Sequence, residues 1–253
     1  MSCQLEYQAA DDLLSGRVVV VTGAGDGIGR AAALSYAAHG ATVILLGRTI
    51  SKLEAVYDEI EQSGGPQPAI YPLDLEGATW SDYETMADRL RETFGRLDGL
   101  LHNAGILGRI TPVQGYNPQL WEQVMKINFQ GPLMMTQALL GLMSASDDAS
   151  IIFTSSSVGR KGRAFWGAYA TSKFATEGLM QILADELENT TTIRVNTLNP
   201  GATRTAMRKA AFPAEDPNSL RTPDEIMPTY LYLMGPDSRG VTGQAFNAQP
   251  PKL

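Results

Sequence analysis

The residues most capable of chemistry are a tyrosine and a lysine four positions apart, Tyr169 and Lys173. Side chains four residues apart on a helix lie on one face, so the lysine ammonium can lie beside the phenol. A free phenol has a pKa of about 10, and an adjacent cation favours the phenolate and lowers that pKa. The pair therefore predicts a general acid or base that exchanges protons with a substrate oxygen. The alternative is an exposed tyrosine and a solvated lysine on an amphipathic helix.

A run of hydroxyl side chains lies shortly before this pair. Ser156 follows the β-branched run at 150–154 and precedes Tyr169 by thirteen residues. If that run is a strand of a parallel sheet, its carboxyl end delivers the hydroxyl to the edge where open α/β folds bind ligands. We therefore expect Ser156 near Tyr169.

A glycine-rich turn, Thr22-Gly-Ala-Gly-Asp-Gly-Ile-Gly29, separates a predicted strand from a predicted helix. Gly23 permits a sharp turn, and Gly27 and Gly29 let backbone amides and the positive helix end meet a pyrophosphate. The spacing Gly-x-x-x-Gly-x-Gly differs from the Gly-x-Gly-x-x-Gly of the standard fingerprint. In this strand–turn–helix context it favours dinucleotide binding over a purely structural turn.

The end of the second predicted strand bears on the choice of dinucleotide. Folds that bind NAD place an acid there on the ribose 2′-hydroxyl, whereas this chain has Gly47 and Arg48. The guanidinium suits a 2′-phosphate, so NADP(H) is favoured and NAD(H) remains possible. The alternative is a solvated Arg48, and Asp26 in the glycine turn adds no positive charge.

Strand and helix patterns alternate along the chain. Apolar β-branched runs predict seven strands, at 17–22, 42–46, 69–73, 97–102, 150–154, 193–198 and 244–247. Helix-period segments lie between them, at 28–39, 51–62, 80–94, 118–143, 166–188 and 223–234. This order predicts an α/β, doubly wound Rossmann fold with a mostly parallel seven-stranded sheet and helices on both faces. We expect one domain over 1–253, with an N-terminal extension at 1–14 and a substrate-loop insertion at 204–223, whose polar part 212–223 could be mobile.

The composition limits the classes of partner. The 253 residues include 20 Lys and Arg against 27 Asp and Glu, a formal net charge of −7, which disfavours nucleic acid and anionic membranes as partners. One cysteine and two histidines cannot build a disulfide framework or a Cys/His zinc site, and no metal is expected. The N-terminal acidic residues do not resemble a secretory signal, so we expect a cytoplasmic protein that acts on a small molecule.

The motifs together resemble those of the short-chain dehydrogenase/reductase family, over residues 16–247. The matching segments are Thr22-Gly-x-x-x-Gly-Ile-Gly29, Asp74, His102-Asn-Ala-Gly105, Asn128, Ser156, Tyr169-x-x-x-Lys173 and Asn199-Pro-Gly-x-x-x-Thr205. Within the family the chain is similar to the bacterial YciK-type oxidoreductases.

The resemblance implies a role for each matching residue. Tyr169 would be the acid/base, Ser156 would donate a hydrogen bond to the reacting oxygen, and Lys173 would lower the Tyr169 pKa and hold the nicotinamide ribose. Asn128 would keep a water in line for a proton relay through Lys173. The implied cofactor-binding set is Gly23, Gly25, Asp26, Gly27, Ile28, Gly29, Arg48, Asp74, Leu75, Asn103, Ala104, Gly105, Tyr169, Lys173, Pro200, Gly201, Thr203 and Thr205. Family members pair their two long helices, so a homodimer or homotetramer is expected.

Three features depart from the family pattern or add to it. His102 replaces the first asparagine of Asn-Asn-Ala-Gly, which we interpret as a structural variation. The ending 243–250 is less glycine-rich than usual and leaves the contacts of the last strand undetermined. Arg160 and Arg163 form a cationic cluster that either belongs to a solvated loop, the favoured interpretation, or binds an anionic substrate tail.

These observations predict an NAD(P)-dependent oxidoreductase that interconverts a carbonyl and a secondary alcohol. A non-catalytic NADP-binding scaffold or redox sensor is the main alternative, although it would need none of the proton-transfer groups. A nucleotide-sugar epimerase or dehydratase can share Tyr-x-x-x-Lys but would need a longer substrate domain and different glycine spacing.

Overall fold

Seven strands form one sheet whose neighbours are all parallel, in the order β3-β2-β1-β4-β5-β6-β7. The computed structural model describes residues 3–250. The strands are β1 (Val18–Thr22), β2 (Thr42–Gly47), β3 (Ala69–Pro72), β4 (Gly99–His102), β5 (Ser150–Thr154), β6 (Arg194–Asn199) and β7 (Ala245–Asn247). Helices cover both faces, so the central strands are apolar on both sides rather than alternating. The predicted doubly wound fold is confirmed.

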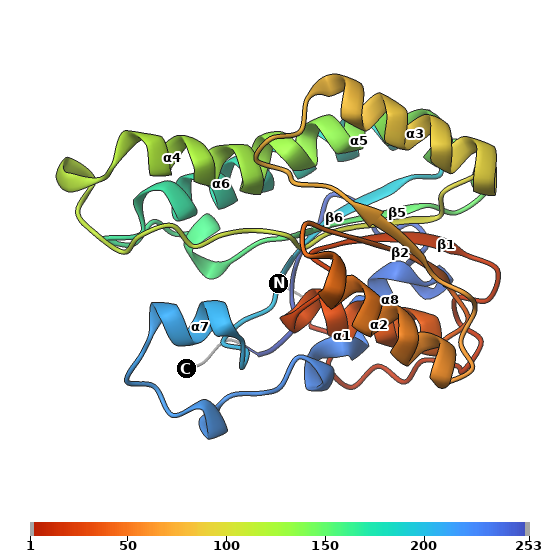
Figure 1. Ribbon diagram of the computed structural model, residues 1–253, viewed down its shortest axis with the longest axis horizontal. Helices are drawn as coiled ribbons and strands as arrows, with labels where there is room; N and C mark the ends of the chain where they lie inside the picture. The colour runs from red at the N-terminus through yellow and green to blue at the C-terminus, as the bar shows by residue number, and fades with distance from the viewer. Residues whose placement is uncertain (1–2, 251–253) are drawn as a thin grey trace.

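Each face of the sheet packs against its own layer of helices (Figure 1). Val19 and Val21 contact the layer of α1 (Gly27–Ala38), α2 (Ile50–Gln62) and α8 (Met227–Met234). Val18 and Val20 point to the layer of α3 (Trp80–Phe94), α5 (Gly131–Met143) and α6 (Gly167–Leu187), with α4 (Pro118–Met125) continuing that layer. The period-two alternation of β1 thus divides the core into two clusters.

The sheet has a switch point between β1 and β4. From β1 the chain builds outward through β2 and β3, then returns to add β4 on the other side of β1. The connections after β1 and β4 therefore diverge and leave a crevice at the carboxyl ends of these strands, where ligands bind in open α/β sheets. The glycine turn and the segment 103–105 follow these two strands.

Two predicted helices differ in detail. The segment 118–143 is helical but contains a π-helical turn, Lys126–Gln130, between α4 and α5, and Asn128 lies in that turn. Such turns are frequent at functional sites and leave no clear mark in apolar periodicity. The segment 223–234 begins as a 3₁₀ turn, Asp224–Ile226, before α8 starts at Met227, next to a proline that suits a helix start.

The insertion 204–223 contains a short helix that the sequence analysis did not predict, α7 (Ala206–Ala211). Thr205 caps it by accepting a hydrogen bond from the Arg208 backbone amide, 3.1 Å. The Arg208 guanidinium then donates to both carboxylate oxygens of Glu215, each at 2.6 Å. This fork ties the helix to the polar stretch that follows it.

The N-terminal segment is attached to the body of the fold. The Leu14 side chain is fully buried and its backbone amide donates to the His39 carbonyl, 2.9 Å. Tyr7 Oη donates to Asp237, 2.7 Å. Within residues 3–250, none of the helices combines the length and the apolar character needed to cross a bilayer.

Candidate active site

A cavity of about 600 Å³ opens at the carboxyl ends of the strands, and most of the predicted site residues line it. Of the predicted set, only Asn128 and Gly29 lie behind its wall rather than on it. Other lining residues are Trp166 and, from the expected substrate-loop insertion 204–223, Met207, Arg208 and Phe212. Lys52, Ile106 and Leu107 also line the cavity, although the sequence suggested no site role for them.

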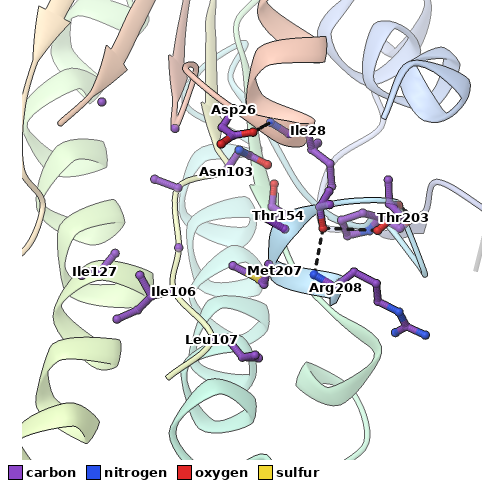
Figure 2. Close-up of a pocket in the computed structure, with 18 of the residues that line it drawn as sticks. Asp26, Ile28, Asn103, Ile106, Leu107, Ile127, Thr154, Thr203, Met207 and Arg208 are labelled. Atoms are coloured by element: carbon purple, nitrogen blue, oxygen red, sulfur yellow. Dashed lines mark hydrogen bonds between the residues drawn. The ribbon is translucent and has the colours of Figure 1, made fainter. Parts of the chain in front are cut away.

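The glycine turn has the backbone geometry that its sequence predicts. Gly23 and Gly27 have φ values of +68° and +53°, which residues other than glycine rarely adopt. A Cβ on Gly29 would lie 2.2 Å from the Gly23 carbonyl oxygen, so only glycine closes this turn. Asp26 caps α1 by accepting a hydrogen bond from the Gly27 amide, 2.7 Å (Figure 2).

A lysine supplies positive charge at this end of the cavity. Lys52 Nζ lies 2.5 Å from the Asp26 carboxylate, and the hydrogen bond from Lys52 holds the Asp26 pKa below its ordinary value. Arg48 is exposed at the same rim, and within residues 3–250 its guanidinium has no ion-pair partner. Lys52 follows Arg48 by four residues, a spacing that could have drawn attention to it.

The loops after β1 and β4 are joined by one hydroxyl. Thr22 Oγ1 accepts hydrogen bonds from the Asn103 and Ala104 amides, at 2.9 and 3.0 Å. Asn103 and Ala104 therefore lie against the glycine turn, and a Cβ on Gly23 would lie 3.1 Å from Ala104 Cα. Gly105 lines the cavity beside them, and Asp74 and Leu75 border it after β3. All five residues line the cavity, and their contact with a cofactor stays a prediction.

His102 has a structural environment. Its ring stacks on Phe153 with centroids 4.7 Å apart and contacts the Thr136 hydroxyl at 2.9 Å. Burial lowers the His102 pKa to about 3, and the charge of Lys173 acts in the same direction. The histidine is thus neutral, which agrees with its interpretation as a structural variation.

Lys173 is buried and its ammonium lies over the Tyr169 ring. Its Nζ donates to the Thr154 carbonyl, 2.7 Å, and lies 5.7 Å from the Tyr169 ring centroid. Burial lowers the Lys173 pKa to about 8, against the opposing charge of Glu177. The lysine therefore titrates close to the physiological range.

Tyr169 differs from the expectation that Lys173 lowers its pKa. Burial raises the pKa of Tyr169 to about 12, and the neighbouring Ser156 hydroxyl acts in the opposite direction. Sequence spacing placed the cation on the correct face, but it could not reveal the desolvation that sets the direction of the Tyr169 pKa shift. In the protein chain the phenol is therefore protonated at neutral pH.

The segment that follows β5 and contains Ser156 packs closely against α6. Ser156 begins the 3₁₀ turn Ser157–Gly159. A Cβ on Gly159 would lie 2.6 Å from the Lys173 Cβ and 3.0 Å from its carbonyl oxygen. Only glycine allows this approach, which brings Ser156, Tyr169 and Lys173 to one cavity.

Asn128 organises the loop after β4. Its Oδ1 accepts from the Ile106 amide, 2.8 Å, while its Nδ2 donates to the Ile106 carbonyl, 2.9 Å, and to Ser172 Oγ, 3.1 Å. Both the oxygen and the nitrogen of the Asn128 side-chain amide therefore make hydrogen bonds within the protein. Any water relay at this position would therefore depend on the Asn128 backbone.

The interpretation of Arg160 as a solvated or substrate-binding cation is wrong. Its Nε donates to the Glu177 carboxylate, 2.7 Å, with both side chains largely buried, and its Nη1 donates to Asn247 Oδ1, 2.9 Å. Glu177 also accepts from the Ser155 hydroxyl, 2.5 Å, and the Thr197 hydroxyl, 2.8 Å. This network links the residue after β5 with α6, β6 and β7, whereas Lys161 and Arg163 remain exposed.

The C-terminal segment completes one wall. Gln249 Nε2 donates to the Pro200 carbonyl, 2.8 Å, and to Thr203 Oγ1, 3.1 Å. Gly201, with φ +74°, passes close to this glutamine. The unusual ending thus holds Pro200, Gly201 and Thr203 at the cavity, a role the sequence analysis did not assign.

Comparisons with known proteins point to one family. The sequence pattern of the family described as short chain dehydrogenase matches residues 17–216. The chain is 56% identical to the oxidoreductase YciK of Escherichia coli K12 over 246 residues, 97% of each chain. A short chain dehydrogenase from Pseudomonas syringae shares 59% identity and a TM-score of 0.95, covering 96% of this chain and 98% of that one. A second solved structure, from Shigella flexneri 2a and complexed with NADP, shares 56% identity and a TM-score of 0.93, over 95% and 100% of the two chains.

Proposed function

The chain belongs to the short-chain dehydrogenase family of oxidoreductases, and we propose that it uses NADP(H) to interconvert a carbonyl and a secondary alcohol. The observation that carries the proposal is the convergence of Ser156, Tyr169 and Lys173 with the glycine turn on a single cavity. A purely structural or binding role would need no buried phenol and ammonium side by side.

The cavity fits a dinucleotide phosphate. The turn around Gly23, Gly27 and Gly29 leaves no room for side chains where a pyrophosphate would meet the start of α1. Arg48 offers planar donors for a 2′-phosphate, and the relative complexed with NADP supports NADP(H) over NAD(H). The rest of the cofactor would lie along Asp74, Leu75 and 103–105 to Pro200, Gly201, Thr203 and Thr205.

Tyr169 would act as the proton donor. The nicotinamide supplies the hydride when bound. A phenol with a pKa of about 12 is protonated at neutral pH and can donate to a carbonyl oxygen that is becoming an alcohol. Ser156, which lowers that pKa, would donate a hydrogen bond to the same oxygen.

Lys173 would restore the proton. Its pKa of about 8 lets it exchange protons near neutral pH, and its ammonium lies over the Tyr169 ring. We propose that Asn128 acts by fixing Ile106 and Ser172, and that any relay water is held by its backbone.

The test is NADPH oxidation with a panel of ketones and aldehydes. We expect turnover by the native chain, loss of turnover in Tyr169→Phe, and unchanged turnover in Tyr57→Phe, a variant of a tyrosine on α2 that does not line the cavity. Retained NADPH binding with no reduction of any carbonyl would instead favour the scaffold or sensor.

Further expectations concern the whole molecule. We propose one domain, in which the segment 204–223 covers the substrate, and a homodimer or homotetramer that light scattering at micromolar concentration would detect. The expected cytoplasmic location stays a prediction.

A further inference from the structure

The cavity beyond the reactive residues is walled by apolar and aromatic side chains. They are Ile106, Leu107, Trp166, Met207, Ala211 and Phe212. Ile106 and Leu107 come from the loop after β4, and Met207 lies across from them on α7, as Figure 2 shows. Such a wall removes apolar area from water but offers an ionised group no partner.

The cations that line this end of the cavity are engaged by other groups, while Lys161 and Arg163 are exposed and do not line it. Arg208 donates to both oxygens of Glu215, and its guanidinium lies 3.9 Å from the Phe212 ring centroid. Lys173 donates to the Thr154 carbonyl, and Arg160 is paired with Glu177. The acidic residues that line the cavity, Asp26 and Asp74, belong to the glycine turn and the β3 loop at the other end. Among residues 3–250, the side chains that line this end of the cavity match neither an anionic nor a cationic substrate.

Backbone strain places the largest of these side chains. Phe165 has φ +74°, and among residues 3–250 it is the only non-glycine residue with positive φ. Its side chain is 54% exposed, so its own burial does not offset the strain, and its carbonyl is held by the Thr111 amide, 3.0 Å. The next residue, Trp166, has its ring 5.9 Å from that of Tyr169 and 5.8 Å from that of Phe212. The strained turn thus sets a flat aromatic surface beside the proton donor.

We propose that the substrate is an uncharged ketone or aldehyde attached to a flat apolar ring, which lies against Trp166 with its carbonyl toward Tyr169. The inference rests on the proposed carbonyl reduction and names the substrate class of that site. The Arg208–Glu215 fork and the Arg208–Phe212 contact hold α7 at this end of the cavity.

The experiment compares three ketones with the NADPH-loaded protein: acetophenone, 4-acetylbenzoate and butanone. We expect kcat/KM for acetophenone to exceed that for its carboxylated counterpart by about tenfold or more, since the carboxylate would lose its hydration without a partner. Trp166→Ala should lower kcat/KM for acetophenone by about tenfold to a hundredfold and for butanone by less than about threefold. Trp80→Ala, which changes an exposed tryptophan on α3, is the matched control.

A binding measurement keeps the test independent of turnover and of folding defects. Benzamide, an unreactive analogue of an aryl ketone, should bind the NADP-loaded native chain in calorimetry, with binding weakened in Trp166→Ala and largely kept in Trp166→Phe. Preference for 4-acetylbenzoate, or an equal loss on acetophenone and butanone, would overturn the substrate class and leave the carbonyl reductase standing. Absence of NADPH oxidation with every carbonyl would overturn both.

Discussion

Buried ionisable side chains have different surroundings at the two ends of the sheet. At the amino ends of the strands, buried Asp98 accepts from Arg96, while buried Asp148 pairs with Arg17 and Arg194. Buried charges there have partners and additional hydrogen bonds, which is the condition under which burial of charge is tolerated.

At the carboxyl ends of the strands, the fold buries ionisable side chains whose pKa values are shifted from their ordinary values. Lys173 is buried with its pKa lowered to about 8, and Tyr169 is buried with its pKa raised to about 12. Perturbed groups of this kind concentrate at functional sites. We therefore expect the amino edge to contribute stability and the carboxyl edge to give up some stability for the proposed chemistry.

The largest expected effect is a loss of folding stability when the ion pairs at the amino ends of the strands are broken. Asp148→Asn removes the shared partner of Arg17 and Arg194 and should lower the free energy of unfolding by about 3–5 kcal/mol in urea titrations at pH 7. Asp88→Asn, in an exposed pair with Arg91, should change it by less than about 1 kcal/mol.

The same variant gives a pH test. Burial acts to raise the Asp148 pKa, but Arg194 and Arg17 outweigh it and hold that pKa below its ordinary value. A depressed carboxyl pKa contributes stability above the unfolded value, about 3.9, and loses it as pH falls through the folded value. The difference in unfolding free energy between the native protein and the Asp148→Asn variant should therefore narrow below about pH 4, and a difference that widens there would contradict the assignment.

At the carboxyl edge, Arg48→Ala should weaken NADPH binding by about tenfold to a hundredfold and NADH binding by less than about threefold, because only NADPH carries the 2′-phosphate. Fluorescence titration of both cofactors measures the ratio, with Arg91→Ala as a remote control. Equal loss for both cofactors would remove Arg48 from the choice of coenzyme.

Lys173→Met should abolish turnover yet raise the free energy of unfolding by about 1–2 kcal/mol, because burial disfavours the charged lysine. A lowered lysine pKa costs stability fully below the folded value, about 8, and the cost disappears as pH approaches the unfolded value, about 10.4. The gain should thus be present at pH 7 and fade by about pH 10. Destabilisation at pH 7 would show that the two edges do not differ in this way.

The smallest expected effect is a shift of the kcat pH profile when Glu177, which pairs with Arg160, is changed. Glu177→Gln removes a charge that raises the Lys173 pKa, so the alkaline limb of the kcat profile should move to lower pH by about one unit. Glu186→Gln, on the exposed face of the same helix, should leave the profile in place. A fall in melting temperature with an unmoved profile would reduce Glu177 to a structural role.

Local patterns predicted most of the fold and the site. The valine run 18–21, the glycine turn and the four-residue spacing of Tyr169 and Lys173 are short-range signals. The valine run forms β1, and the other two features lie at the cavity. The order of motifs predicted the seven-stranded sheet because strands and helices alternate without a break.

The features that the sequence did not predict depend on tertiary contacts. Arg160 resembles a loop cation until Glu177, seventeen residues away, is brought against it by α6. The short helix α7 depends on the Arg208–Glu215 fork rather than on apolar periodicity. The Tyr169 pKa is set by burial, which no spacing encodes.

The most direct test of the account is a single-turnover measurement of hydride transfer from bound NADPH to a ketone that the native chain reduces, in native and Tyr169→Phe proteins. Removal of a general acid should slow this step by about a hundredfold to ten-thousandfold, with NADPH affinity and unfolding free energy changed little. Hydride transfer in the phenylalanine variant within about threefold of the native rate would contradict the assignment of Tyr169 as the proton donor.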